Sequence, residues 1–99
     1  METRDEILKF LAANRDYFRQ QFHVNKIGLF GSFARNEQTP QSDIDLLIEI
    51  DADAEDVHQL KNRMREFIAV RSKRTVDLAR EKYLRPYARN QILKETIFV

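Results

Sequence analysis

Cysteine is absent from this chain of 99 residues. Disulfide bonds and metal sites built on thiolates are therefore excluded, and the absence is compatible with a reducing compartment. The sequence also shows no signal peptide and no apolar run long enough to span a membrane. From these absences we expect a cytoplasmic protein.

An excess of one charge is lacking as well. The chain has 17 Lys and Arg residues against 16 Asp and Glu residues, which leaves a formal net charge of +1. No overall field therefore draws it to nucleic acid or to a membrane surface, although the balance is compatible with a local basic patch. We expect neither membrane association nor direct binding to nucleic acid.

Internal repeats, low-complexity stretches and linkers are also missing. Apolar residues make up 42% of the chain and charged residues 33%, which is ordinary for a globular domain and too apolar for a disordered one. A chain of this length buries about two thirds of its unfolded surface. We expect one domain over residues 1–99 with one modest core.

The most informative stretch runs from Leu29 to Ile50, with the sequence LFGSFARNEQTPQSDIDLLIEI. An apolar run over Ile27–Phe30 ends in Gly31 and Ser32. A short helix-compatible segment and a polar loop follow, and a second apolar run begins after them. The simplest interpretation is two strands joined by a turn that could hold a phosphate.

Carboxylates open the second apolar run. The alternation of a strand places Asp43 and Asp45 together on one face. Two like charges at close range repel each other unless a cation neutralises them, so this pair predicts a divalent ion. Oxygen ligands of this kind suit magnesium or manganese. The same face continues through Leu47 and Glu49, and the opposite, core face is predicted to hold Ile44, Leu46, Ile48 and Ile50.

The turn between the two strands has the residues of an anion site. Gly31 allows close approach of the backbone, and Ser32 lies where a strand gives way to a short helix predicted over residues 33–36. Arg35, on that helix, can add a positive charge. An anion cradle beside a divalent-cation site is what a triphosphate with its bound metal requires.

A third carboxylate, Asp77, interrupts an otherwise apolar strand predicted over residues 75–79. It is either a third metal ligand, brought beside Asp43 and Asp45 by strand pairing, or a surface residue on a half-exposed strand. The first interpretation is favoured because the other parts of the site are present. The preceding basic segment, Arg71–Arg74, is either a solvated helix end or a group near the triphosphate.

Three helices complete the prediction. The first begins at a capping box formed by Thr3 and Glu6 and runs to about Gln21, and its wide apolar surface is either all core or partly a partner surface. Helices over residues 54–70 and 86–96 follow, the second starting at a proline. The apolar end, residues 97–99, either packs on the core or awaits a partner.

The spacing of Gly31-Ser32, ten residues and Asp43-x-Asp45 resembles the signature of the polymerase-β-type nucleotidyltransferase superfamily. The segments GSFARN and SDIDLLIEI are similar to those of its smallest members, the MNT-type minimal nucleotidyltransferases. This resemblance covers nearly the whole chain. The resemblance implies an α+β fold, with a small mixed sheet of three or more strands flanked by helices, as in the polymerase-β-like palm. Asn36 departs from the family, where glycine is common, but asparagine also tolerates a left-handed helix end.

The resemblance also implies an activity. Asp43, Asp45 and Asp77 would be the catalytic residues and would hold two Mg²⁺ ions, while AMP moves from ATP to a hydroxyl. Members of this group are often antitoxins in hetero-oligomeric complexes with a HEPN-domain toxin, and similar proteins attach AMP to a tyrosine of that toxin. Two alternatives are a catalytically idle antitoxin that acts by binding alone, and transfer to a small molecule.

Overall fold

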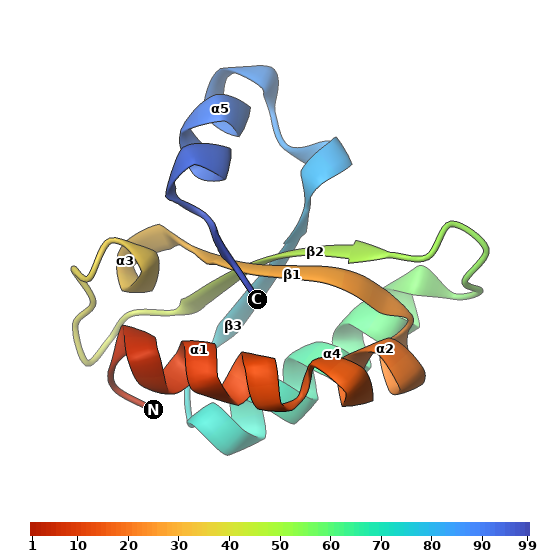
Figure 1. Ribbon diagram of the computed structural model, residues 1–99, viewed down its shortest axis with the longest axis horizontal. Coiled ribbons are helices and arrows are strands. Elements are labelled where there is room, and N and C mark those ends of the chain that lie inside the picture. Colours follow the sequence, from red (N-terminus) through yellow and green to blue (C-terminus); the bar gives the residue numbers. More distant parts are fainter.

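The sheet is the centre of the computed structural model, which describes residues 1–99 (Figure 1). Its strands are β1 (Val24–Phe30), β2 (Ile44–Ile50), β3 (Val76–Arg80) and β4 (Ile97–Phe98), in the order β3-β2-β1-β4. β1 pairs antiparallel with β2 and with β4, whereas β2 and β3 are parallel. The predicted mixed sheet and α+β class are confirmed.

Helices cover the two faces of this sheet unequally. In Figure 1, α1 (Arg4–Ala13), α2 (Arg15–Phe22) and α4 (Val57–Ser72) lie together below the sheet. A 3₁₀ turn, η1 (Glu81–Tyr83), and helix α5 (Pro86–Glu95) stand on the other side, and the short α3 (Gly31–Ala34) follows β1. None of the helices combines the length and apolar character needed to cross a membrane.

The predicted first helix is broken in two at Asn14. It starts with the expected capping box, in which the Glu6 N–H donates to Thr3 Oγ1 at 3.1 Å and the Thr3 N–H donates to Glu6 Oε1 at 3.2 Å. At Asn14, however, the side-chain amide donates to the carbonyl of Phe10 at 2.9 Å and the backbone leaves helical geometry. The Asn14 N–H still donates to the same carbonyl at 3.1 Å, so α1 and α2 follow each other with one non-helical residue between them.

The main core lies between the sheet and helices α1, α2 and α4. The alternation of β2 is confirmed, because Ile44, Leu46, Ile48 and Ile50 are all buried in it. Met64 is fully buried on α4, as expected of a flexible side chain that fills core gaps. Eighteen buried residues form this one cluster, so most of the stability of the fold comes from a single face of the sheet.

Aromatic side chains join α2 to α4 at the border of the core. Tyr17 stacks on Phe67 with ring centroids 4.8 Å apart, and Phe18 meets Phe67 edge-on at 5.7 Å. Phe18 and Phe22 are buried, whereas Tyr17 keeps 42% of its surface exposed. The core interpretation of this surface therefore holds for Phe18 and Phe22, and an exposed rim remains at Tyr17.

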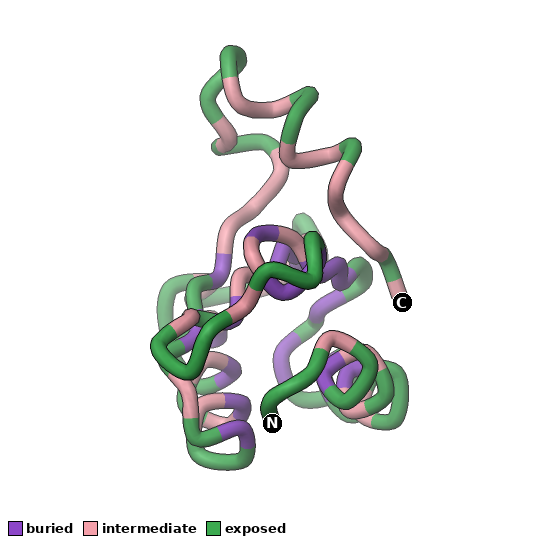
Figure 2. Tube along the Cα trace, turned by 90° about the vertical axis from the view of Figure 1, so that its left-hand side faces the viewer, coloured by how far each residue is buried: buried purple, intermediate pink, exposed green.

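The C-terminal part packs more loosely than the rest. α5 begins at Pro86 as predicted, but no residue of the helix is fully buried (Figure 2). The apolar end of the chain packs back on the sheet, where Ile97 and Phe98 form β4 against β1 and the Val99 N–H donates to the carbonyl of Ile27 at 3.0 Å. This strand was not predicted. Its formation shows that the apolar chain end packs back on the rest of the protein, which was the first of the two alternatives.

Candidate active site

Strand register brings two of the predicted carboxylates side by side. Asp45 of β2 and Asp77 of β3 are direct partners in the parallel pair, and neighbouring strands lie about 4.8 Å apart. Asp43 precedes β2 and shares the period-two face of Asp45. The Ile44 N–H donates to the carbonyl of Thr75 at 2.9 Å and fixes the start of both strands. Asp45 and Asp77 are therefore neighbours, and Asp43 lies near enough for its charge to act on Asp45.

The electrostatics of this group are those of crowded like charges. Burial, followed by the negative charges of Asp77 and Asp43, raises the pKa of Asp45 to about 6. Arg35 opposes this rise and Glu95 adds to it. A carboxyl in these surroundings favours a bound proton or a nearby cation over the bare anion.

Gly31 is fitted against the same carboxylate. Its φ of +78° lies in the left-handed region, and a Cβ atom built at this position would collide with the Asp45 side chain. The contact follows from the register of β1 and β2, in which Phe30 is the partner of Asp45. Only glycine fits here, because any other residue is strained at positive φ and carries a Cβ atom for which there is no room.

Ser32 lies one residue further along, in the single turn of α3. This helix starts two residues earlier than predicted, at Gly31, and its predicted last residue, Asn36, has the left-handed φ of 61° that its residue type favours. The hydroxyl of Ser32 forms no hydrogen bond with the rest of the chain, and the residue is half-buried beside Gly31. It is therefore free to donate to an anion.

Arg35 is occupied by carboxylates. Its Nε donates to Glu37 Oε1 and its Nη1 to Glu95 Oε2, both at 2.7 Å. The bond to Glu95, and then that to Glu37, raises the pKa of the guanidinium above its ordinary value. Arg35 thus connects α3 to the end of α5 while its charge reaches Asp45.

Glu95 is the neighbour that sequence reasoning missed. It lies 60 residues from Arg35, and only the docking of α5 joins them. One signal was available, because a carboxylate in the last turn of a helix opposes the helix dipole and needs another reason to be there.

Arg74, the last residue of the basic segment, is bound to backbone carbonyls. Its Nε donates to the Met1 carbonyl at 2.7 Å, and its Nη1 donates to the carbonyl of Ser42 at 2.8 Å. The same Nη1 reaches the Thr39 and Pro40 carbonyls at 3.2 and 3.4 Å. Arg74 therefore holds the loop that leads into Asp43, and the two interpretations of the segment Arg71–Arg74 stay predictions.

The donor set suits a hard divalent cation. Asp43, Asp45 and Asp77 offer carboxylate oxygens only, which magnesium prefers. The side chains are not gathered into a ready-made cluster of three metal ligands. Asp43 and Asp77 are exposed, whereas Asp45 is half-buried. Their role as ligands stays a prediction.

Comparison with known families assigns the chain to one of them. The family model of the nucleotidyltransferase domain matches residues 11–99. The chain belongs to this nucleotidyltransferase family. The match includes the sheet, Gly31 and all three aspartates.

Two further similarities concern whole proteins. This nucleotidyltransferase is 31% identical over 101 residues to the protein adenylyltransferase MntA of Thermococcus cleftensis, covering 100% of this chain and 98% of the relative. It also resembles the solved structure of a provisionally named minimal nucleotidyltransferase, with a TM-score of 0.71, 28% identity, and coverage of 91% of this chain and 93% of the other.

A third similarity concerns the fold alone. The crystal structure of a toxin–antitoxin with AMP-PNP matches with a TM-score of 0.64 and 20% identity, covering 96% of this chain and 70% of that one.

Proposed function

We propose that this nucleotidyltransferase moves AMP from ATP to a hydroxyl group of a partner protein. The observation that carries the proposal is the register of β2 and β3, which sets Asp45 beside Asp77 directly under Gly31. Asp43, Asp45 and Asp77 would together hold two Mg²⁺ ions. Bound magnesium supplies positive charge that acidifies the attacking hydroxyl and neutralises the phosphates.

The chain's own residues would bind and orient the nucleotide. The Ser32 hydroxyl and the N–H groups around Gly31 would hold the β- and γ-phosphates, where charge builds on the leaving group. Arg35 would add a positive charge from its place between α3 and α5. In the reaction, the acceptor oxygen forms a bond to the α-phosphorus, the bond from the α-phosphorus to the bridging oxygen breaks, pyrophosphate leaves with the electron pair, and the hydroxyl proton passes to solvent.

The acceptor in this proposal is a tyrosine of a HEPN-domain toxin, which the chain neutralises as an antitoxin in a hetero-oligomeric complex. Transfer to a protein is supported by the 31% identical relative named a protein adenylyltransferase. The toxin partner is supported by the resemblance of GSFARN and SDIDLLIEI to MNT-type proteins. We further propose that residues 1–99 act as one domain in the cytoplasm, where ATP is available.

The test is transfer of label from α-labelled ATP to protein. The chain is incubated with magnesium and ATP, with and without the product of the adjacent gene, and labelled protein is mapped by mass spectrometry. We expect label on a partner tyrosine, and its loss in Asp43→Asn and Asp77→Asn. Asp53→Asn is the matched control, because it removes one exposed carboxylate from the turn after β2 and leaves the three site residues intact.

Two outcomes separate the alternatives. If the wild-type chain labels nothing but still silences the partner, binding alone explains neutralisation and the enzymatic proposal fails. If label appears on a small molecule and never on protein, the acceptor class is wrong while nucleotidyl transfer stands.

A further inference from the structure

Asp43 is held in place through the residues on either side of it. It lies one residue before β2, and its side chain is exposed. On one side, the Ile44 N–H donates to the carbonyl of Thr75 at 2.9 Å. On the other side, the carbonyl of Ser42 accepts from Nη1 of Arg74 at 2.8 Å. Both bonds come from adjacent residues of the segment that leads into β3, so this segment fixes the backbone around Asp43.

Arg74 binds the whole turn that precedes Asp43. Its Nη1 also reaches the carbonyls of Thr39 and Pro40 at 3.2 and 3.4 Å, in a turn that is closed by the Ser42 N–H donating to the Thr39 carbonyl at 3.0 Å. The guanidinium carbon lies 4.8 Å from the ring centroid of the buried Phe33 on α3. Hydrogen bonds from a charged donor are stronger than neutral ones, so Arg74 is a firm attachment for the turn.

The bonds of Arg74 depend on the shape of its side chain. None of the ion pairs of the chain includes Arg74. Its Nε donates to the carbonyl of Met1 at 2.7 Å while Nη1 serves the turn. A guanidinium group is a rigid fork that can donate in two directions at once, whereas the ammonium of lysine is a single point charge. Lysine therefore cannot replace these bonds.

We propose that Arg74 is a positioning residue, which holds Asp43 where it can share a divalent cation with Asp45 and Asp77. The inference rests on the proposed function, in which these carboxylates are metal ligands. Arg74 lies three residues before Asp77, so one short segment places both exposed aspartates relative to each other. Groups that orient metal ligands without touching the metal contribute about 10- to 100-fold to metal affinity or activity.

Two other roles for Arg74 predict different results. If only its charge mattered, removing it would strengthen cation binding, because a positive charge near the site repels the cation. If it bound the triphosphate, removing it would weaken ATP binding and leave the binding of a metal ion without nucleotide unchanged. A positioning role predicts weaker binding of the metal ion alone. The affinity for a metal ion without nucleotide therefore separates the three roles.

The probe is Mn²⁺ alone, titrated into the intact chain at pH 7.5 and followed by the electron paramagnetic resonance signal of the free ion. Arg74→Ala should weaken Mn²⁺ binding about 10- to 100-fold. Arg74→Lys keeps the charge but not the two-way bonding, so its affinity should lie closer to that of Arg74→Ala than to that of the wild type. In parallel, amide hydrogen exchange should become faster at residues 39–44 in Arg74→Ala.

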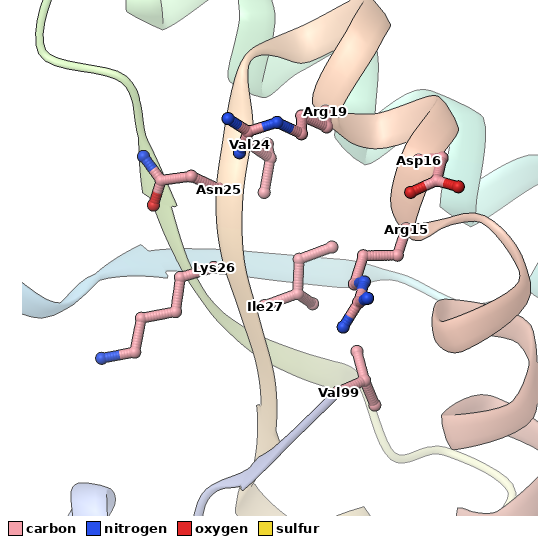
Figure 3. Close-up of a pocket in the computed structure, with 8 residues that line it drawn as sticks. All are labelled: Arg15, Asp16, Arg19, Val24, Asn25, Lys26, Ile27 and Val99. Atoms are coloured by element: carbon pink, nitrogen blue, oxygen red, sulfur yellow. The ribbon is translucent and has the colours of Figure 1, made fainter.

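Arg19→Ala is the matched control, because it also removes one arginine charge. Arg19 is exposed on α2 and lines a hollow of about 230 Å³ beside Val24 (Figure 3). This is the opposite end of β1 from Phe30, the partner of Asp45. Arg19→Ala should bind Mn²⁺ as the wild type does and leave the exchange of residues 39–44 unchanged.

Two results would overturn the inference. One is binding of Mn²⁺ by Arg74→Ala that equals or exceeds that of the wild type. The other is weaker binding with unchanged exchange at residues 39–44, because the loss would then not come from the turn. Circular dichroism verifies folding, and if Arg74→Ala does not fold, Arg74→Lys is judged by the same two criteria. A wild type that binds no Mn²⁺ refutes the proposed metal site itself, whereas the first two results leave that site standing.

Discussion

Replacing Asp45 with asparagine should stabilise the fold while it abolishes catalysis. In the metal-free protein, burial and the neighbouring charges of Asp77 and Asp43 raise the pKa of Asp45 to about 6. The folded state therefore holds a proton that the unfolded state has already lost. As pH rises through the window from about 4 to about 6, wild-type stability must fall, because folding then requires an unfavourable carboxylate.

The size of the effect follows from the same shift. A carboxyl moved from its ordinary pKa of about 3.9 to about 6 corresponds to about 3 kcal/mol at neutral pH. Asp45 is only half-buried, and solvent screening reduces this to about 1–1.5 kcal/mol. For a domain of this size, that difference raises the melting temperature of Asp45→Asn by about 4–12 °C above the wild type at pH 7.5.

The assay is thermal and urea unfolding in EDTA at pH 4, 5, 6 and 7.5. The two proteins should converge at pH 4 and separate as pH rises, and Mg²⁺ should stabilise the wild type but not the variant. Asp53→Asn, which removes an exposed charge elsewhere, should follow the wild type at every pH. If Asp45→Asn is the less stable protein at pH 7.5, or if both show the same pH dependence, charge crowding at this site is not what the structure indicates.

Other substitutions test separate parts of the structure. Gly31→Ala should cost about 1–3 kcal/mol in urea unfolding, from positive φ and the collision with Asp45, and should also abolish stabilisation by magnesium and ATP. Gly28→Ala, which crowds β4 instead, should destabilise the fold but keep nucleotide binding, and loss of binding in both variants would refute a local effect. Met64→Ala should cost about 2–5 kcal/mol by the same assay, because it opens a cavity in the core, and a smaller loss would mean that the core collapses around it. Thr3→Ala should lower stability by about 1 kcal/mol through loss of the capping box, and unchanged circular dichroism melting would contradict that cap.

Local chemistry made part of this structure predictable. The alternation of β2, the capping box at Thr3, the proline at the start of α5 and the left-handed Asn36 each depend on residues close in sequence. The pairing of Asp45 with Asp77 was predicted from two strands that each had a clear pattern, and the register confirms their juxtaposition. Their roles as metal ligands stay a prediction.

Features that depend on distant contacts were not predictable in the same way. β4 has two residues, too few for any alternation, and exists because the turn after α5 returns the chain to β1. The bond between Arg35 and Glu95 likewise forms only because the end of α5 lies beside α3 in the folded chain. The break at Asn14 changes the backbone of a single residue and keeps the hydrogen bond from the Asn14 N–H to the Phe10 carbonyl, so the pattern of apolar residues did not reveal it.

The two faces of β2 differ in chemistry, because one is apolar and the other carries carboxylates. The Ile44 face is buried in the main core, whereas the other face carries Asp45, whose pKa is raised by burial and by the charges of Asp77 and Asp43. In a chain of 99 residues with a single core, the burial of this carboxylate among like charges costs a sizeable fraction of the total stability. Cation binding should therefore be coupled to folding in this protein, and Gly31 is the residue that makes room for Asp45.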